Sequence, residues 1–416
     1  MCKIKFLLIF CIFLFIFSVQ LLADENSTAS SGSITQIEII GLRRTREETV
    51  LFPLERFLGR DASLLDVNDV QAVIRNVGVV EPVNIELIES DNGFILRLTV
   101  AERWSIFPFP LIMAGSGSWT LGLFLADTNA FGLANQLAGG VIYGSSGLSV
   151  ISVYNHNAGR SRFPGWNIMF MYGNQEVKNT DSSENVYRLY NINSLRISLG
   201  LNYPVNDILS VSTSHSFTNI ALEDNTNKIS PPENGAMLLG NSINLSLRSS
   251  NWDGIFLSQR SLSLRYGYTY DFLGSYSHET GLRLVFEHSI IPGFRITSTG
   301  NASWRPGTGH STDIYTESGP PGEILPSGFS ASSYAGISLG LEKNLMQFSW
   351  GNISVLASWQ TVLSYNSITG NDFNHGPSGG IRLFLSRIAL PALGAYFAYN
   401  MSADLFQMGF SMGMGF

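Results

Sequence analysis

Two short segments of the sequence have the Gly-x-Ser-x-Gly spacing that, in hydrolases, holds a nucleophilic serine on a sharp strand-to-helix turn. They cover residues 336–340 and 409–413. Both continue an alternation of apolar and polar residues and precede no helical pattern, so neither has the required turn. The six histidines are scattered without the spacing of metal ligands. The sequence therefore predicts no catalytic centre, no metal site and no cofactor, and a lipase built on a barrel remains an open alternative.

A different chemistry is suggested by charged residues on the polar side of alternating segments. One segment alternates Leu262, Leu264 and Tyr266 with Ser263 and Arg265. In a barrel, confined arginine and glutamate side chains either form internal ion pairs or line an anion-preferring pore. The polar side otherwise consists of Gly, Ser and Asn, which suits a crowded aqueous interior. The charges placed in this interior are Arg196, Arg248, Arg265, Arg283, Glu287, Glu342 and Arg382.

The composition indicates which fold positions these charges. Charged residues make up 14% of the 416 residues, whereas a typical globular domain has about 25%. After residue 22, no apolar run approaches the roughly 20 residues that a membrane-spanning helix needs. The net charge of −7 argues against nucleic acid as a partner. An all-β secreted protein and a transmembrane β-barrel remain.

Residues 1–23 have the pattern of a secretory signal peptide. Lys3 and Lys5 precede an apolar stretch over 6–19, and the small residue Ala23 ends the segment. Both cysteines of the chain lie in this segment, so the exported protein is predicted to contain no disulfide. Residues 24–33 are Ser-rich and predict a flexible linker.

Residues 34–102 are predicted to form a small α+β domain with the order β-α-α-β-β. The capping-box spacing from Thr45 to Glu48 predicts the start of a first helix. A second helix is expected over 66–77, ending at Gly78. Two alternating strands follow, joined by turn residues at 91–93.

From residue 103 to 416 the pattern has period two, which predicts an all-β transmembrane barrel. Sixteen strands are expected, an even number that suits a closed barrel. Long connections at 177–187, 220–237, 305–330 and 365–375 each follow an odd-numbered strand, so they share one rim. The N-terminal domain is then expected with the short turns, in the periplasm. The predicted strands are 104–113, 118–128, 135–144, 147–156, 165–176, 188–202, 207–219, 238–250, 257–272, 276–290, 293–304, 331–344, 350–364, 376–388, 393–402 and 405–416.

The two strands that must meet to close this barrel differ in how well they can form backbone hydrogen bonds. The last strand places Phe406, Phe410 and Phe416 on one face and ends on an aromatic residue. The first strand contains Pro108 and Pro110, which cannot donate ladder hydrogen bonds. The sequence therefore predicts a weak seam between the first and last strands that opens more easily than any other pair.

In this arrangement the chain resembles the BamA/TamA superfamily of outer-membrane assembly and translocation proteins (bacterial surface antigen family), with a single POTRA-type domain. The resemblance implies an outer-membrane barrel in contact with lipid, whose N-terminal domain lies in the periplasm and meets accessory proteins. It further implies assistance, without a cofactor, to the insertion or translocation of unfolded outer-membrane client proteins through the seam. The matching residues are 39–102, the early turn with Asn129, Phe131 and Gly132, the segment 376–382, and the end of the chain at 410–416.

The resemblance also implies a loop that folds into the lumen. In the family this loop carries Arg-Gly-Phe/Tyr, and its arginine meets an acidic residue on the thirteenth strand. Here Gly328 and Phe329 are kept, Ser327 stands in place of the arginine, and residues 359–362 offer no carboxylate. Losing both partners is physically favoured, because one unpaired charge in a confined site costs more than none. A pore-forming or structural barrel that has lost the assembly activity is therefore the alternative function.

Overall fold

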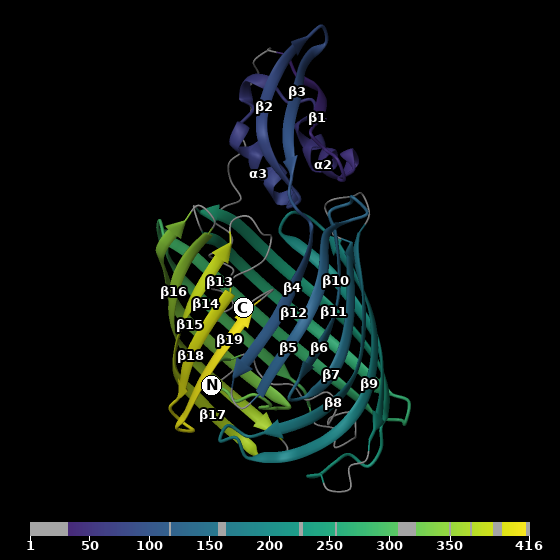
Figure 1. Cartoon of the computed structure of the whole chain (residues 1–416), viewed down its shortest axis with the longest axis vertical. Helices are drawn as coiled ribbons and strands as arrows, with labels where there is room; N and C mark the ends of the chain where they lie inside the picture. Colours follow the sequence, from purple (N-terminus) through teal and green to yellow (C-terminus); the bar gives the residue numbers. More distant parts are fainter. Residues whose placement is uncertain are drawn as a thin grey trace, which may run out of the picture.

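The computed structural model describes residues 32–115, 118–156, 164–223, 228–253, 256–306, 322–348, 351–366, 368–385 and 393–412. They form a small α+β domain at one end of a closed β-barrel (Figure 1). None of the helices in these ranges is both long and apolar enough to cross a bilayer.

The N-terminal domain is built on a three-stranded sheet with the order β1-β3-β2. Strand β1 (Ile34–Ile40) runs parallel to β3 (Gly93–Glu102), and β2 (Val80–Ser90) pairs antiparallel with β3. Helices α2 (Glu47–Leu54) and α3 (Val67–Val77) lie between β1 and β2 in the chain. The order β-α-α-β-β predicted from the periodicity is confirmed.

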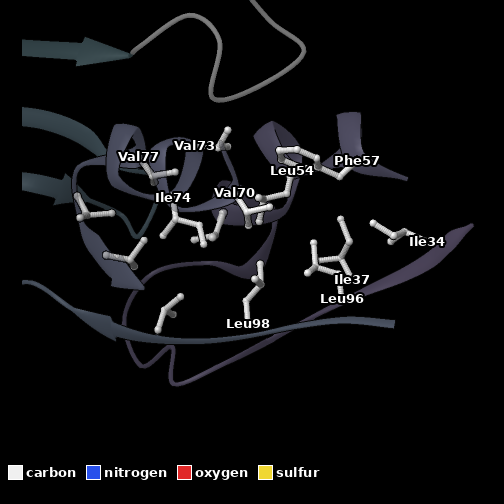
Figure 2. Packing of buried hydrophobic residues seen from close by; sticks show 14 of the residues in the cluster. Ile34, Ile37, Leu54, Phe57, Val70, Val73, Ile74, Val77, Leu96 and Leu98 are labelled. Carbon is white, nitrogen blue, oxygen red and sulfur yellow. The ribbon is translucent and has the colours of Figure 1, made fainter. Parts of the chain in front are cut away.

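The helices and the sheet bury one common apolar core (Figure 2). Leu54 of α2, Val70 and Ile74 of α3, and Leu96 and Leu98 of β3 are completely buried. Burying each such side chain contributes roughly 1.5–3 kcal/mol relative to leaving it exposed. This core gives the domain a fixed surface against which the barrel can pack.

The two helices differ in how they begin. At α3, the Asp66 carboxylate accepts the Asn68 N–H at 2.8 Å, and Gly78 ends the helix at φ 82°, as the sequence predicts. At α2, the N-cap residue is Arg46, which makes no side-chain cap hydrogen bond. The capping box predicted at Thr45 is therefore wrong, because the Thr45 hydroxyl bonds a barrel residue instead.

Sixteen antiparallel strands form the barrel, each beside its sequence neighbour, with β19 next to β4 (Figure 1). Side chains alternate between the outer surface and the lumen. The strands are β4 (Ile106–Gly115), β5 (Ser118–Ala130), β6 (Asn135–Gly144), β7 (Gly147–His156), β8 (Gly165–Thr180), β9 (Val186–Pro204), β10 (Leu209–Leu222), β11 (Ala236–Asp253), β12 (Phe256–Asp271), β13 (Tyr276–Ile291), β14 (Phe294–Trp304), β15 (Ser333–Phe348), β16 (Gly351–Asn366), β17 (Gly370–Leu385), β18 (Leu393–Asn400) and β19 (Leu405–Met412).

Most strands lie within a few residues of their predicted positions, but two predicted long connections are wrong. Strand β8 continues to Thr180 and β9 begins at Val186, so the predicted connection at 177–187 is short. Strand β17 begins at Gly370, six residues before its predicted start at 376, so the connection at 365–375 is also short. Both strand ends are polar, and a strand that extends beyond the apolar zone shows no apolar alternation.

The two rims of the barrel differ. The turn between β5 and β6 lies against the N-terminal domain, and we call this end the domain-side rim. At the opposite end, the far rim, β10 and β14 end, and the intervals that separate them from the next strands, residues 223–235 and 305–332, are the longest in the barrel sequence. Long connections on one rim and short turns on the other are typical of outer-membrane barrels.

Candidate functional site: the seam, the lumen and the domain joint

Strands β4 and β19 close the barrel with few paired residues. In the described part of the chain, their register pairs are Gly409 with Gly115 and Phe410 with Ala114. Strands β11 and β12 are in register over all 16 residues of β12. Any pairs that continue this register beyond Met412 lie outside the described residues. The β4–β19 junction is therefore the least paired contact of the described barrel wall.

Both prolines of the first strand lie in β4. Pro108 and Pro110 pair in unbroken register with Leu125 and Leu123 of β5. Being two residues apart, their nitrogens face the same neighbouring strand. The intact register with β5 indicates that the missing donors face away from β5.

The predicted aromatic face of the last strand lies on the outer surface. Phe406 and Phe410 are 61% and 40% exposed, whereas Phe416 lies outside the described residues. On the lumen side, a side chain at Gly409 would collide with the ring of Tyr396 from β18. The last strand therefore presents Phe406 and Phe410 to the outside of the barrel and Gly409 to the lumen, where the Tyr396 ring lies against it.

Neither Gly-x-Ser-x-Gly segment forms a nucleophile elbow in the described residues. Residues 336–340 lie inside β15, and 409–412 lie inside β19. A catalytic serine of this type requires a sharp turn into a helix, and both segments are extended strand. The structure therefore places these serines in the barrel wall.

The described part of the far-rim connection, residues 322–332, packs against lumen-facing side chains. Phe329 is 7% exposed and forms a bridge with Thr180 at the end of β8. The Gly328 carbonyl accepts the Thr180 N–H at 2.9 Å, and Gly328 has φ 89°, which favours glycine. The apolar cluster around Phe329 consists of Ile324, Leu325, Ala331, Val362 of β16 and Ala398 of β18.

The polar contact that holds this loop differs from the arginine–carboxylate pair of the resembled family. Ser327 is exposed, and its hydroxyl accepts from the Ser118 hydroxyl at 2.9 Å. Gln360 of β16, the thirteenth barrel strand, accepts the Glu323 N–H at 2.9 Å and donates to the Glu323 carboxylate at 3.1 Å. The loop supplies the carboxylate and the strand supplies a neutral amide. Sequence reasoning missed this pair because a loop gives no register that aligns Glu323 with Gln360.

A network of ion pairs crosses the lumen wall from β13 to β17. Glu342 of β15 is completely buried and accepts from Arg295 of β14 at 2.6 and 2.8 Å. Arg382 of β17 and the Ser354 hydroxyl also bond the Glu342 carboxylate, while Arg295 reaches Glu287 of β13 at 3.1 Å. Internal ion pairing is thus found for three of the predicted lumen charges, Glu287, Glu342 and Arg382.

The other predicted lumen charges are exposed. Arg196, Arg265 and Arg283 make no ion pair with the described residues, and Arg248 donates to the Gln259 amide at 3.3 Å. Arg295, at the centre of the ion-pair network, was missed from the sequence. Its position between Phe294 and Ile296 in an alternating strand was the signal that could have revealed it.

The N-terminal domain is joined to the barrel by a set of contacts that we call the domain joint. The Arg44 guanidinium forms a two-pronged ion pair with Asp127 of β5, with Nη1 and Oδ1 at 3.1 Å, and also bonds Ser105 at 2.5 Å. Asn129, from the predicted early turn, donates to the Thr45 hydroxyl at 2.9 Å. Both contacts link the β1–α2 loop to the end of β5.

The same turn reaches the first helix of the domain. The Gly132 carbonyl accepts from the Arg46 N–H at 2.8 Å and from the Thr49 hydroxyl at 3.0 Å. Phe131 is 65% exposed and accepts from Arg46 Nε at 3.1 Å through its carbonyl. Ala134 is fully buried in the apolar core of the domain. The three predicted turn residues thus hold the domain against the barrel.

Glu102, the last residue of β3, organises the domain side of the joint. Its carboxylate accepts the N–H groups of Arg43, Arg44 and Thr45 at 2.6–3.1 Å. Partial burial raises the pKa of Glu102, but these hydrogen bonds outweigh it and hold the pKa below its ordinary value of 4.5.

A depressed pKa predicts a pH dependence of stability. The contribution of ionised Glu102 is present above the ordinary value of 4.5 and is lost as the pH falls through the folded-state value. We expect Glu102→Gln to lower the thermal unfolding midpoint at pH 7, and the difference from wild type to shrink below pH 4.5. Unfolding followed by tryptophan fluorescence at several pH values measures this. A difference that grows on acidification would contradict the assignment.

Comparison with known proteins agrees on the fold. No protein-family model and no curated protein matches the sequence. Among solved structures, CdiB from Acinetobacter baumannii is similar with a TM-score of 0.64 and 14% identity, covering 92% of this chain and 74% of that one. CdiB from Escherichia coli gives a TM-score of 0.63 with 12% identity over 92% and 77% of the two chains.

A third similar structure is BamA from Haemophilus ducreyi lacking POTRA domains 1–3. Its TM-score is 0.58 with 13% identity, covering 93% of this chain and 86% of that one. The alignments extend over both the N-terminal domain and the barrel, since they omit less than a tenth of the chain. The chain therefore has the fold of CdiB and BamA.

Proposed function

We propose that this chain is an outer-membrane protein that inserts or translocates client polypeptides through the seam between β4 and β19. In this proposal, residues 34–102 form a single POTRA-type domain in the periplasm. The observation that carries the proposal is the sparse pairing of β4 with β19 within the described residues of the closed barrel. The likeness in fold to CdiB and BamA supports it.

The seam supplies what a client strand needs without any covalent chemistry. A junction with fewer ladder hydrogen bonds costs less to open than a full ladder. An opened strand edge offers unpaired N–H and C=O groups to an incoming chain, which is β-augmentation. No nucleotide or cofactor is required for such an exchange of strands.

A disulfide across the seam tests the proposal. Cysteines replacing Ala114 and Phe410 face each other in register, so oxidation would lock β4 to β19. We expect oxidation to stop the assembly of client outer-membrane proteins, and a reductant to restore it. The readout is the abundance of other outer-membrane barrels in cells depleted of the wild-type protein.

A matched control uses the register pair Leu245 and Leu264 of β11 and β12, far from the seam. Oxidising cysteines at these positions should leave client assembly unchanged. If locking the seam also leaves assembly unchanged, the proposed function is wrong.

A second function, a structural or pore-forming barrel without assembly activity, is favoured by the loop chemistry. Ser327 replaces the arginine of the resembled family, and Gln360 replaces the acidic partner. Unchanged levels of all other outer-membrane proteins after depletion would favour this second candidate.

A further inference from the structure

Three arginines lie near one another on the lumen wall of β11, β12 and β13. Arg248 of β11 pairs in register with Ser261, and Arg283 of β13 pairs with Ser263. Arg265 follows two residues further along β12 on the same face. Neighbouring strands are about 4.8 Å apart, so the three long side chains can reach a common ligand. We call these residues the arginine patch.

The positive charge of the arginine patch is not neutralised within the described residues. Arg265 and Arg283 form no ion pair there, and Arg248 bonds only the neutral Gln259 amide through its side chain. The acidic residues of β13 are engaged elsewhere: Glu287 with Arg295 and Glu279 with Arg305. All three patch arginines are exposed to the lumen.

Neutral hydrogen-bonding groups surround the patch. The hydroxyls of Ser246 and Ser263 are 3.0 Å apart between the arginines, and Asn301 is the register partner of Arg283. Guanidinium groups form planar, two-pronged hydrogen bonds with carboxylates, and hydroxyls and amides add further donors. This combination of groups fits an oxyanion better than an apolar or cationic ligand.

The patch is reached from the domain-side rim. The Arg248 N–H donates to the carbonyl of Ile208, which lies in the turn between β9 and β10 on that rim. The other two arginines lie deeper, near the middle of their strands. The chain as a whole carries a net charge of −7, so this basic surface stands out against an acidic protein. Low-dielectric walls strengthen its field inside the barrel.

We propose that the arginine patch binds carboxylate-rich segments of a polypeptide that enters the lumen from the domain-side rim. The polypeptide nature of the ligand rests on the proposed function, whereas the preference for carboxylates rests on the three arginines. The patch attracts acidic segments into the barrel and repels basic ones.

Fluorescence anisotropy of a labelled oligoglutamate peptide, with the full-length protein in a neutral detergent, tests the proposal. We expect the wild type to bind the peptide, and the triple variant R248Q/R265Q/R283Q to bind it about tenfold or more weakly. Binding should weaken with added salt, because ions screen charges in a wet lumen. A labelled oligolysine peptide should not bind.

Arg260→Gln is the matched control, because Arg260 lies on the same strand as Arg265 but on the alternate, outer face. It should bind oligoglutamate like the wild type. If the triple variant does not fold, as judged by its heat-dependent mobility in SDS gels, the single variants R265Q and R283Q replace it.

The outcomes for the patch and for the seam are separable. Equal oligoglutamate binding by the wild type and by the variants of the patch arginines overturns the proposed role of the arginine patch, whatever the seam disulfide shows. If oligoglutamate binding depends on the arginines, the arginine patch is supported. If client assembly continues when the seam is locked, the proposed function is overturned, and the result for the patch still stands.

Discussion

Replacing Glu342 with glutamine is expected to destabilise the barrel by about 3–5 kcal/mol, the usual cost of removing one partner from a buried ion pair. Glu342 is completely buried, and Arg295 beside it is only 7% exposed at its side chain. Without the carboxylate, Arg295 keeps Glu287 and the face of the Phe256 ring, 4.6 Å away. Arg382 loses its ion-pair partner Glu342 as well.

Urea unfolding in detergent, followed by tryptophan fluorescence, measures this loss. Glu233→Gln is the control, since Glu233 is exposed in a far-rim connection and its loss should change stability by less than about 0.5 kcal/mol. Equal stability of the two variants would show that the ion-pair network does not hold the wall from β13 to β17.

Breaking the domain joint is expected to let the N-terminal domain adopt many orientations relative to the barrel instead of one. In the variant R44A/N129A, the domain loses its ion pair to Asp127 and the hydrogen bond from Asn129 to Thr45. Pulsed electron spin resonance between labels at Val83 on β2 and Leu264 on β12 measures the orientation. Both positions are accessible to a spin label, because Val83 is 65% exposed and Leu264 is 49% exposed.

The wild type should give one narrow distance distribution, and the joint variant a broad one. Arg97→Ala provides the control, because it removes the Arg97–Glu38 pair, whose nitrogen and oxygen lie 2.9 Å apart within the domain. A narrow distribution in the joint variant would mean that the covalent linker, the remaining hydrogen bonds to Phe131 and Gly132, and the Ala134 contact suffice to fix the domain.

The strands of the barrel were predictable because residues that face the outside and residues that face the lumen alternate along each strand, and the two faces differ in polarity. Strand β7 was expected at 147–156 and is found there, and the Gly78 end of α3 follows from its positive φ. The start of β17 at Gly370 was not predictable, because polar residues above the apolar zone carry no such pattern.

The functional contacts were less predictable, since they join residues far apart in the chain. The Thr45 hydroxyl was expected to cap a helix but bonds Asn129, 84 residues away. The lumen charges could be placed on the correct face from their odd or even positions in the alternating strands alone. Their pairing could not, because the choice between Arg295 and Arg283 as the partner of Glu342 depends on strand register and tilt.

The turn between β5 and β6 has a consequence for how the chain unfolds. Gly132 lies so close to the domain that an added Cβ would stand 2.4 Å from the Arg44 carbonyl, and Ala134 fills part of the core of the domain. A fragment that ends after β3 would therefore expose an apolar hole and leave the first turn of α2 without two of its hydrogen-bond partners. The composition changes near residue 103, but unfolding should be cooperative across this boundary. The small domain and the first hairpins of the barrel should therefore melt in a single transition.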